Sequence, residues 1–193
     1  TPARAFIPVE ERETITIRDG DRAGLISKLE AARRNRLPSR SIKHVLVRIE
    51  SFGGGSRFAT AKDFFETIDF KAPSGFTENL HDKFDILLYY RPDGADVGFV
   101  LDPKDHERAL AHMLAWENSI ILDFRTLYFD KTVTQPQYLF TDTVVRNVDM
   151  RTITLQENTT FSYGIFAQRF LVIALSNEFT DVLLGRLLAA PPR

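Results

Sequence analysis

The sequence predicts an α+β fold: a mostly antiparallel sheet with a hairpin and a C-terminal meander, and helices packed mainly on one face. The hairpin is indicated by two apolar runs, residues 86–90 and 97–101, which flank the turn-forming stretch Arg-Pro-Asp-Gly-Ala-Asp. The meander is indicated by extended segments that follow one another between residues 143 and 175. Segments with helical apolar spacing lie before, between and after these strands.

The N-terminal elements follow from alternation and capping signals. Residues 1–12 are punctuated by prolines, which predicts an extended lead-in or linker. Threonine alternates with isoleucine over residues 14–17, which predicts a short strand. A helix is expected from about Asp21 to Asn35, and residues 41–50 alternate in the manner of a half-buried strand.

A glycine-rich break at residues 52–56 separates this strand from two expected helices. Thr60 and Asp63 form a capping-box-like start for a helix through about residue 68. Residues 74–84 are expected to form another short helix, because three apolar side chains recur there at four-residue spacing.

The longest expected helix carries the only tryptophan of the chain. Asp102 is the expected N-cap and Pro103 the first helical residue, since proline is tolerated in the first turn. Apolar spacing continues toward Ile121, and residues 123–142 are expected to be irregular.

The chain is expected to end in the meander and a final helix. Ser176 or Asn177 is the expected N-cap of that helix, which carries apolar residues at helical spacing. The expected strands cover residues 143–156 with a bend near 147–149, then 161–166 and 170–175.

Composition is that of an ordinary soluble globular domain: of 193 residues, 44% are hydrophobic and 26% charged, with a formal net charge of −1. One domain is expected over residues 13–189, followed by a tail at 190–193. Cysteine is absent, which excludes disulfides, thiolate nucleophiles and zinc–thiolate or iron–sulfur sites. We interpret the basic cluster Arg33, Arg34 and Arg36 as a helix C-terminus and expect no nucleic-acid partner.

No sequence motif points to a catalytic, cofactor or metal site. The glycine run at residues 53–55 lacks the lysine and hydroxyl residue of a phosphate-binding loop. His106 and His112 are six residues apart and project in different directions from a helix, so they do not form a metal-ligand pair. A Gly-x-Ser-x-Gly nucleophile elbow is absent. We therefore expect no cofactor and assign no catalytic residue.

Two groups of residues remain as candidates for contacts with other molecules. The first surrounds the glycine run, where two phenylalanines beside a loop suit a protein partner. The second surrounds Trp116, which we expect to pack against the sheet, with Glu117 paired to Arg151 or Arg125; a cleft there would suit a small ligand or a hydrolytic site. The candidates are Phe52, Gly53, Gly54, Gly55, Arg57 and Phe58 in the first group, and Trp116, Glu117, Asp149 and Arg151 in the second.

Several short motifs carry a family resemblance, namely Met113, Leu114, Trp116 and Glu117 in the long helix and Asn147, Asp149 and Arg151 in the meander. With these residues the chain resembles an uncharacterised protein family of ultrasmall, reduced-genome bacteria. In that family Met-Leu-x-Trp-Glu ends the long helix, the meander carries Asn-x-Asp-x-Arg, and a Leu-Val-Ile strand precedes a helix that starts with Asn-Glu. The resemblance implies a single-pass membrane protein with a disordered cytoplasmic tail, one transmembrane helix and this domain outside. The matching residues here are Met113, Leu114, Trp116, Glu117, Asn147, Asp149, Arg151, Leu171, Val172, Ile173, Asn177 and Glu178.

These observations lead to three functional hypotheses. The first is a non-enzymatic interaction or structural domain at the cell envelope, extracytoplasmic and working through protein contacts, with any membrane anchor preceding Thr1. The alternative is a small-ligand-binding or hydrolytic domain with the cleft near Trp116. The third is a module that forms a homo-oligomer through a sheet edge or a phenylalanine-rich surface.

Overall fold

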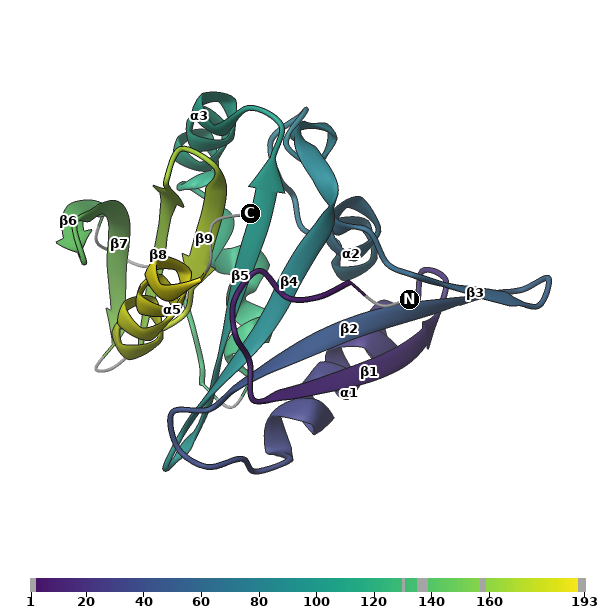
Figure 1. The fold of residues 1–193 in the computed structure, drawn as a ribbon. Coiled ribbons are helices and arrows are strands. Elements are labelled where there is room, and N and C mark those ends of the chain that lie inside the picture. The colour runs from purple at the N-terminus through teal and green to yellow at the C-terminus, as the bar shows by residue number, and fades with distance from the viewer. Residues whose placement is uncertain (1–2, 130, 135–138, 157–158, 191–193) are drawn as a thin grey trace.

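The computed structural model describes residues 3–129, 131–134, 139–156 and 159–190. It confirms the α+β fold: a nine-stranded, mostly antiparallel mixed sheet that ends in a C-terminal meander, with five α-helices (Figure 1). The strands run in the order β1-β2-β4-β5-β9-β8-β7-β6, and β3 pairs with the second half of β2. Among the described strands, only β1 and β2 pair in parallel, and α1 connects them.

The elements have the following bounds. The strands are β1 Glu11–Arg18, β2 Ile42–Ser51, β3 Gly55–Phe58, β4 Leu80–Arg91, β5 Gly94–Pro103, β6 Thr141–Val145, β7 Val148–Gln156, β8 Thr159–Phe166 and β9 Phe170–Ala174. The helices are α1 Arg22–Arg34, α2 Ala61–Ile68, α3 His106–Trp116, α4 Ile120–Phe124 and α5 Asn177–Ala189, with 3₁₀ turns η1 Thr77–Asn79 and η2 Arg125–Tyr128.

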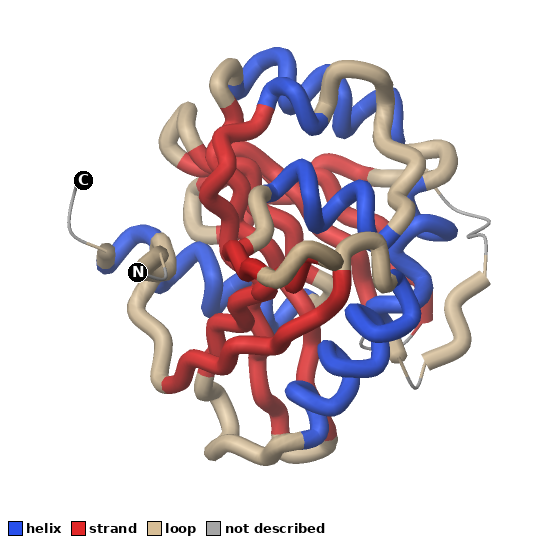
Figure 2. The backbone as a smooth tube through the Cα atoms, turned by 90° about the vertical axis from the view of Figure 1, so that its right-hand side faces the viewer, coloured by secondary structure: helices blue, strands red, loops and turns tan. Residues whose placement is uncertain are grey.

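Two apolar cores lie on opposite faces of the sheet. Helices α1 to α4 cover one face, as the side view in Figure 2 shows, and α5 covers the other. Packing of helices mainly on one face was predicted from the dominance of hairpins, which is typical of α+β folds. The lead-in joins the second core: Phe6 and Ile7 are buried, and the Phe6 amide donates to Asp85 Oδ2 at 2.6 Å.

Several capping predictions are confirmed by the structure. Asp21 caps α1 by accepting from the Gly24 amide at 2.8 Å, and Thr60 and Asp63 form the reciprocal capping box of α2. Ser176 caps α5 through the Phe179 amide. These signals are local, because each depends on a side chain that reaches a backbone amide two or three residues ahead.

The prediction of a helix at residues 74–84 is wrong. Only the short turn η1 forms there, and Leu80 already begins β4. A spacing of four residues fits a helix, but it also places side chains on the same face of a strand, whose period is two. Leu80 and Phe84 share a face of β4 and pack against the core in this second way.

The start and the end of the expected long helix also differ. Asp102 and Pro103 belong to β5, where Pro103 pairs with Leu80, and Asp105 is the N-cap of α3. The helix ends at Trp116, and α4 follows as a separate element. The region expected to be irregular contains η2 and the start of β6, whereas Pro136 lies outside the described residues.

Candidate functional site

A groove of about 700 Å³ lies between α3 and the strands β6 to β8, and we call it the α3–β7 groove. It is large enough for a short peptide segment or a drug-sized molecule. The residues that line it are His106, Glu107, Leu110, Ala111 and Leu114 from α3, and Asp142, Asp149, Met150, Arg151, Gly164, Ile165 and Gln168 from the strands and the β8–β9 turn.

The groove exists because α3 has two apolar faces. Ala109, Met113 and Trp116 turn into the core, while Leu110 and Leu114 face the groove. Leu114 is 45% exposed, whereas Leu110 also packs against the core. Helical spacing alone did not distinguish Leu114 from the core-facing side chains, although an apolar stripe wider than one helix face was a signal that could have done so.

The strand register places the charged groups of the other wall on one face of the sheet. Asp142 lies opposite Arg151, and Val144 lies opposite Asp149. Cross-strand partners share a face, and side chains two residues apart in a strand do so as well. All four side chains therefore point to the helix-covered side, where Val144 is 67% exposed beside the groove.

A charged network closes the groove toward the core. Arg151 donates two hydrogen bonds to Glu117, at 2.9 and 2.8 Å, and a third to Asp142 at 2.9 Å. The Tyr163 hydroxyl donates to Glu117 at 2.6 Å. The predicted pairing of Glu117 with Arg151 is thus confirmed, and the bidentate geometry makes the pair specific.

Two groups of this network, Arg151 and Tyr163, hold their protons more tightly than usual. The hydrogen bonds to Glu117 and Asp142 raise the pKa of the Arg151 guanidinium above its usual range. Burial, together with the hydrogen bond to Glu117, raises the pKa of the Tyr163 hydroxyl. A base or acid for catalysis needs a pKa near the working pH, so neither group suits proton transfer.

Trp116 is a core residue and not a ligand platform. It is 1% exposed, and its indole Nε1 donates to Asp123 at 2.7 Å. The rings of Phe76 and Phe124 pack against it, with centroids at 5.4 and 5.6 Å. Of the four residues of the sequence-predicted cleft, Asp149 and Arg151 line the groove, Glu117 lies behind Arg151, and Trp116 has no access to it.

The residues of the glycine-rich break form a hairpin and not a simple loop. Gly55–Phe58 pairs with β2 as β3, and the hairpin extends away from the body of the fold (Figure 1). Arg57 is bound to Asp63, and Phe58 lies under the Arg48 guanidinium at 5.2 Å. Only Phe52, which is 93% exposed at the tip, presents an apolar side chain to solvent.

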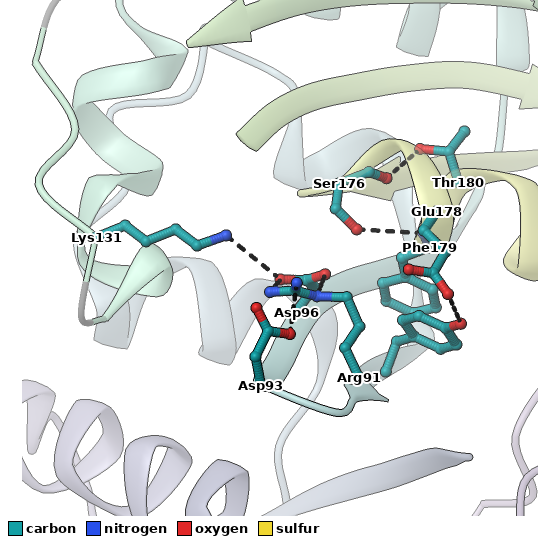
Figure 3. Close-up of polar contacts among 9 residues, drawn as sticks. Arg91, Asp93, Asp96, Lys131, Ser176, Glu178, Phe179 and Thr180 are labelled. Carbon is teal, nitrogen blue, oxygen red and sulfur yellow. Dashed lines mark hydrogen bonds and ion pairs between the residues drawn. The ribbon is translucent and has the colours of Figure 1, made fainter. Parts of the chain in front are cut away.

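A second polar cluster lies at the turn between β4 and β5 (Figure 3). Arg91 donates to both Asp93 and Asp96, and Lys131 lies 3.8 Å from Asp96. Its charges neutralise one another, so we interpret the cluster as structural. Within the described ranges, no three His, Asp or Glu side chains are grouped so as to hold a metal ion, and no helix is long and apolar enough to cross a membrane.

Comparisons with family models, curated proteins and solved structures find no match to this chain. The resemblance to the bacterial envelope family therefore stays a prediction from the sequence.

Proposed function

We propose that this chain is a non-enzymatic interaction domain that binds a short segment of a partner protein, rich in basic and apolar side chains, in the α3–β7 groove. The observation that carries the proposal is the combination of an exposed apolar wall with an acidic rim. Leu110 and Leu114 form the wall, and Glu107, Asp142 and Asp149 form the rim.

Charge selects the partner. Three carboxylates line the groove, and its one arginine, Arg151, is already held by Glu117 and Asp142. The negative charge that remains attracts lysine and arginine side chains, and it speeds the encounter with a basic segment. An acidic segment would be repelled by the same groups.

Apolar contact supplies the other part of the affinity. Exposed apolar side chains that are grouped on one surface commonly mark binding sites. Leu114 lines the groove, and Val144 is exposed on the sheet face that carries Asp149 of the groove, so both offer apolar surface to a bound segment. Burial of this surface favours binding, and the ordering of the bound segment offsets part of that gain.

The test is a binding measurement on peptide arrays that vary charge and apolar content independently. Peptides with both basic and apolar residues are expected to bind, and the variant Leu114→Asn is expected to weaken binding about tenfold, because it removes an apolar side chain from the wall and leaves the charge of the groove unchanged. Leu188→Asn is the matched control: Leu188 is 56% exposed on α5, which covers the opposite face. Equal loss in both variants, or binding only by acidic peptides, would contradict the proposal.

A second variant tests whether the partner binds the groove or the β2–β3 hairpin. Phe52→Ser removes the one exposed aromatic side chain of the hairpin tip without touching the groove. Binding is expected to be unchanged. Loss of binding in this variant alone would move the contact surface to the hairpin.

We further propose that the domain works at the cell envelope on the extracytoplasmic side. Its support is the family resemblance in the long helix and the meander. Protease accessibility of the chain in intact cells tests this proposal: cleavage without cell lysis is expected, and complete protection would contradict it.

A further inference from the structure

Strand β6 forms one edge of the sheet and has few features that would prevent another strand from pairing with it. Among the described residues its only strand partner is β7. Four of its five residues, Thr-Asp-Thr-Val-Val, are β-branched, and none is lysine or proline. Edge strands of natural proteins are usually shielded by charges, proline or bulges. At the opposite edge β1 shows such shielding, with Glu11, Arg12, Glu13 and Arg18.

The position of strand β6 is fixed by its turn and by two ion pairs. The turn between β6 and β7 has two residues, Arg146 and Asn147, both with positive φ as a type I′ hairpin requires. Arg146 donates to Asp181 at 2.9 Å, which ties the turn to α5. At the other end, Arg151 binds Asp142. An edge fixed in this way loses little conformational entropy when another strand joins it.

The register determines which backbone groups point outward. In a two-residue hairpin the residues that flank the turn, here Val145 and Val148, direct their backbone groups toward each other. The alternation of the ladder then directs the N–H and C=O groups of Asp142 and Val144 away from β7. These same two residues direct their side chains to the face that holds the groove.

We infer that the basic, apolar segment binds as an additional β-strand beside β6, with its alternate side chains in the α3–β7 groove. The inference rests on the proposed function and names its binding mode. Backbone hydrogen bonds to Asp142 and Val144 supply affinity that is independent of sequence, and the groove selects the side chains. On the groove side the added strand meets Val144 and Leu114 with apolar residues, and Asp142 and Asp149 with basic ones.

Charge favours such a segment over a second copy of the same edge. Two β6 strands paired edge to edge would bring the Asp142 carboxylates of the two copies onto neighbouring strands, with Asp149 one strand behind each. Juxtaposed like charges disfavour that pairing, whereas a lysine or arginine in the added strand removes the repulsion.

The probe is a synthetic peptide of about eight residues with threonine at every second position. Leucine and lysine take turns at the positions between, so that one face of the extended peptide is basic and apolar. Two N-methylated versions carry the methyl groups on alternate amides, in opposite phases. Only one set of amides of an added strand faces β6. One methylated peptide is therefore expected to lose binding about tenfold or more, and the other is expected to bind as the parent does.

The protein variants are Val144→Pro and Val144→Thr. Proline removes the outward N–H of an edge strand, where the fold tolerates it, and its ring blocks the approach of another strand. Val144→Pro is expected to weaken peptide binding about tenfold or more, and Val144→Thr by much less. Trp116 fluorescence and circular dichroism check that both variants are folded.

The outcomes separate this inference from the proposed function. If Leu114→Asn weakens binding while both methylated peptides and Val144→Pro bind normally, strand addition is overturned and the groove proposal stands. If the parent peptide does not bind at all, both are overturned. A concentration-dependent dimer of the protein without peptide, disrupted by Val144→Pro, would assign the edge to a second copy and overturn the inferred partner.

Discussion

Replacement of Gly164 by alanine is predicted to destabilise the fold through a collision between β7 and β8. A Cβ atom at Gly164 would lie 2.4 Å from Met150 Sδ and 2.6 Å from the backbone oxygen of Asp149. The methionine side chain can move, but the Asp149 oxygen cannot retreat by the required several tenths of an ångström without shifting β7. Overpacking of this kind costs about 1–3 kcal/mol. For a domain of this size, 1 kcal/mol lowers Tm by about 2–4 °C.

The assay is urea-induced unfolding followed by the fluorescence of Trp116, the only tryptophan and a fully buried one. Gly55→Ala is the matched control, because a Cβ atom there meets nothing within 4 Å. Gly55 lies in a strand with no left-handed φ, so the control is expected to be neutral or slightly stabilising. Equal midpoints for the two variants would refute the reasoning that β7 and β8 approach closely at Gly164.

Three further predictions concern the core, one helix cap and the charged network. Phe124→Ala is expected to cost about 3–5 kcal/mol in urea unfolding, since the ring is fully buried among other aromatic rings. Asp63→Asn is expected to destabilise the fold at pH 7 but hardly at pH 2. The hydrogen bond from Arg57, together with the hydrogen bonds of the helix cap, lowers the pKa of Asp63 to about 2. The contribution of Asp63 to the free energy of unfolding is therefore complete above the ordinary pKa near 4 and is lost as the pH falls toward 2. Unfolding at both pH values checks this, and an equal loss at each would contradict it. Arg151→Met is expected to lower the free energy of unfolding by about 1–3 kcal/mol, because it leaves the half-buried carboxylate of Glu117 without its cation. A loss below about 0.5 kcal/mol, which is typical of a surface substitution, would contradict a stabilising role of the network.

The elements that could be predicted from the sequence are those fixed by neighbours along the chain. The β4–β5 hairpin, the meander and the caps Asp21, Thr60 and Ser176 all depend on turn residues or on side chains a few positions from the backbone they bind. The two strands of the β4–β5 hairpin are longer than predicted, since charged segments such as the start of β4 carry no alternation signal.

The elements that could not be predicted depend on contacts distant in sequence. Strand β3 is four residues long and exposed, so only its pairing with β2 defines it. The α3–β7 groove requires the register of β6 on β7 and the placement of α3 beside β8, neither of which any local pattern reports. The sequence did single out Asp149 and Arg151, but it joined them to Trp116, which the aromatic core encloses.

Amide hydrogen exchange of β6, measured with and without the basic, apolar peptide, is the most direct test of the binding account. Strand addition predicts that the amides of Asp142 and Val144, which face outward, become protected when the peptide binds, while those of Thr143 and Val145 change little. Saturated peptide binding with no slowing of exchange at Asp142 and Val144 would contradict the account.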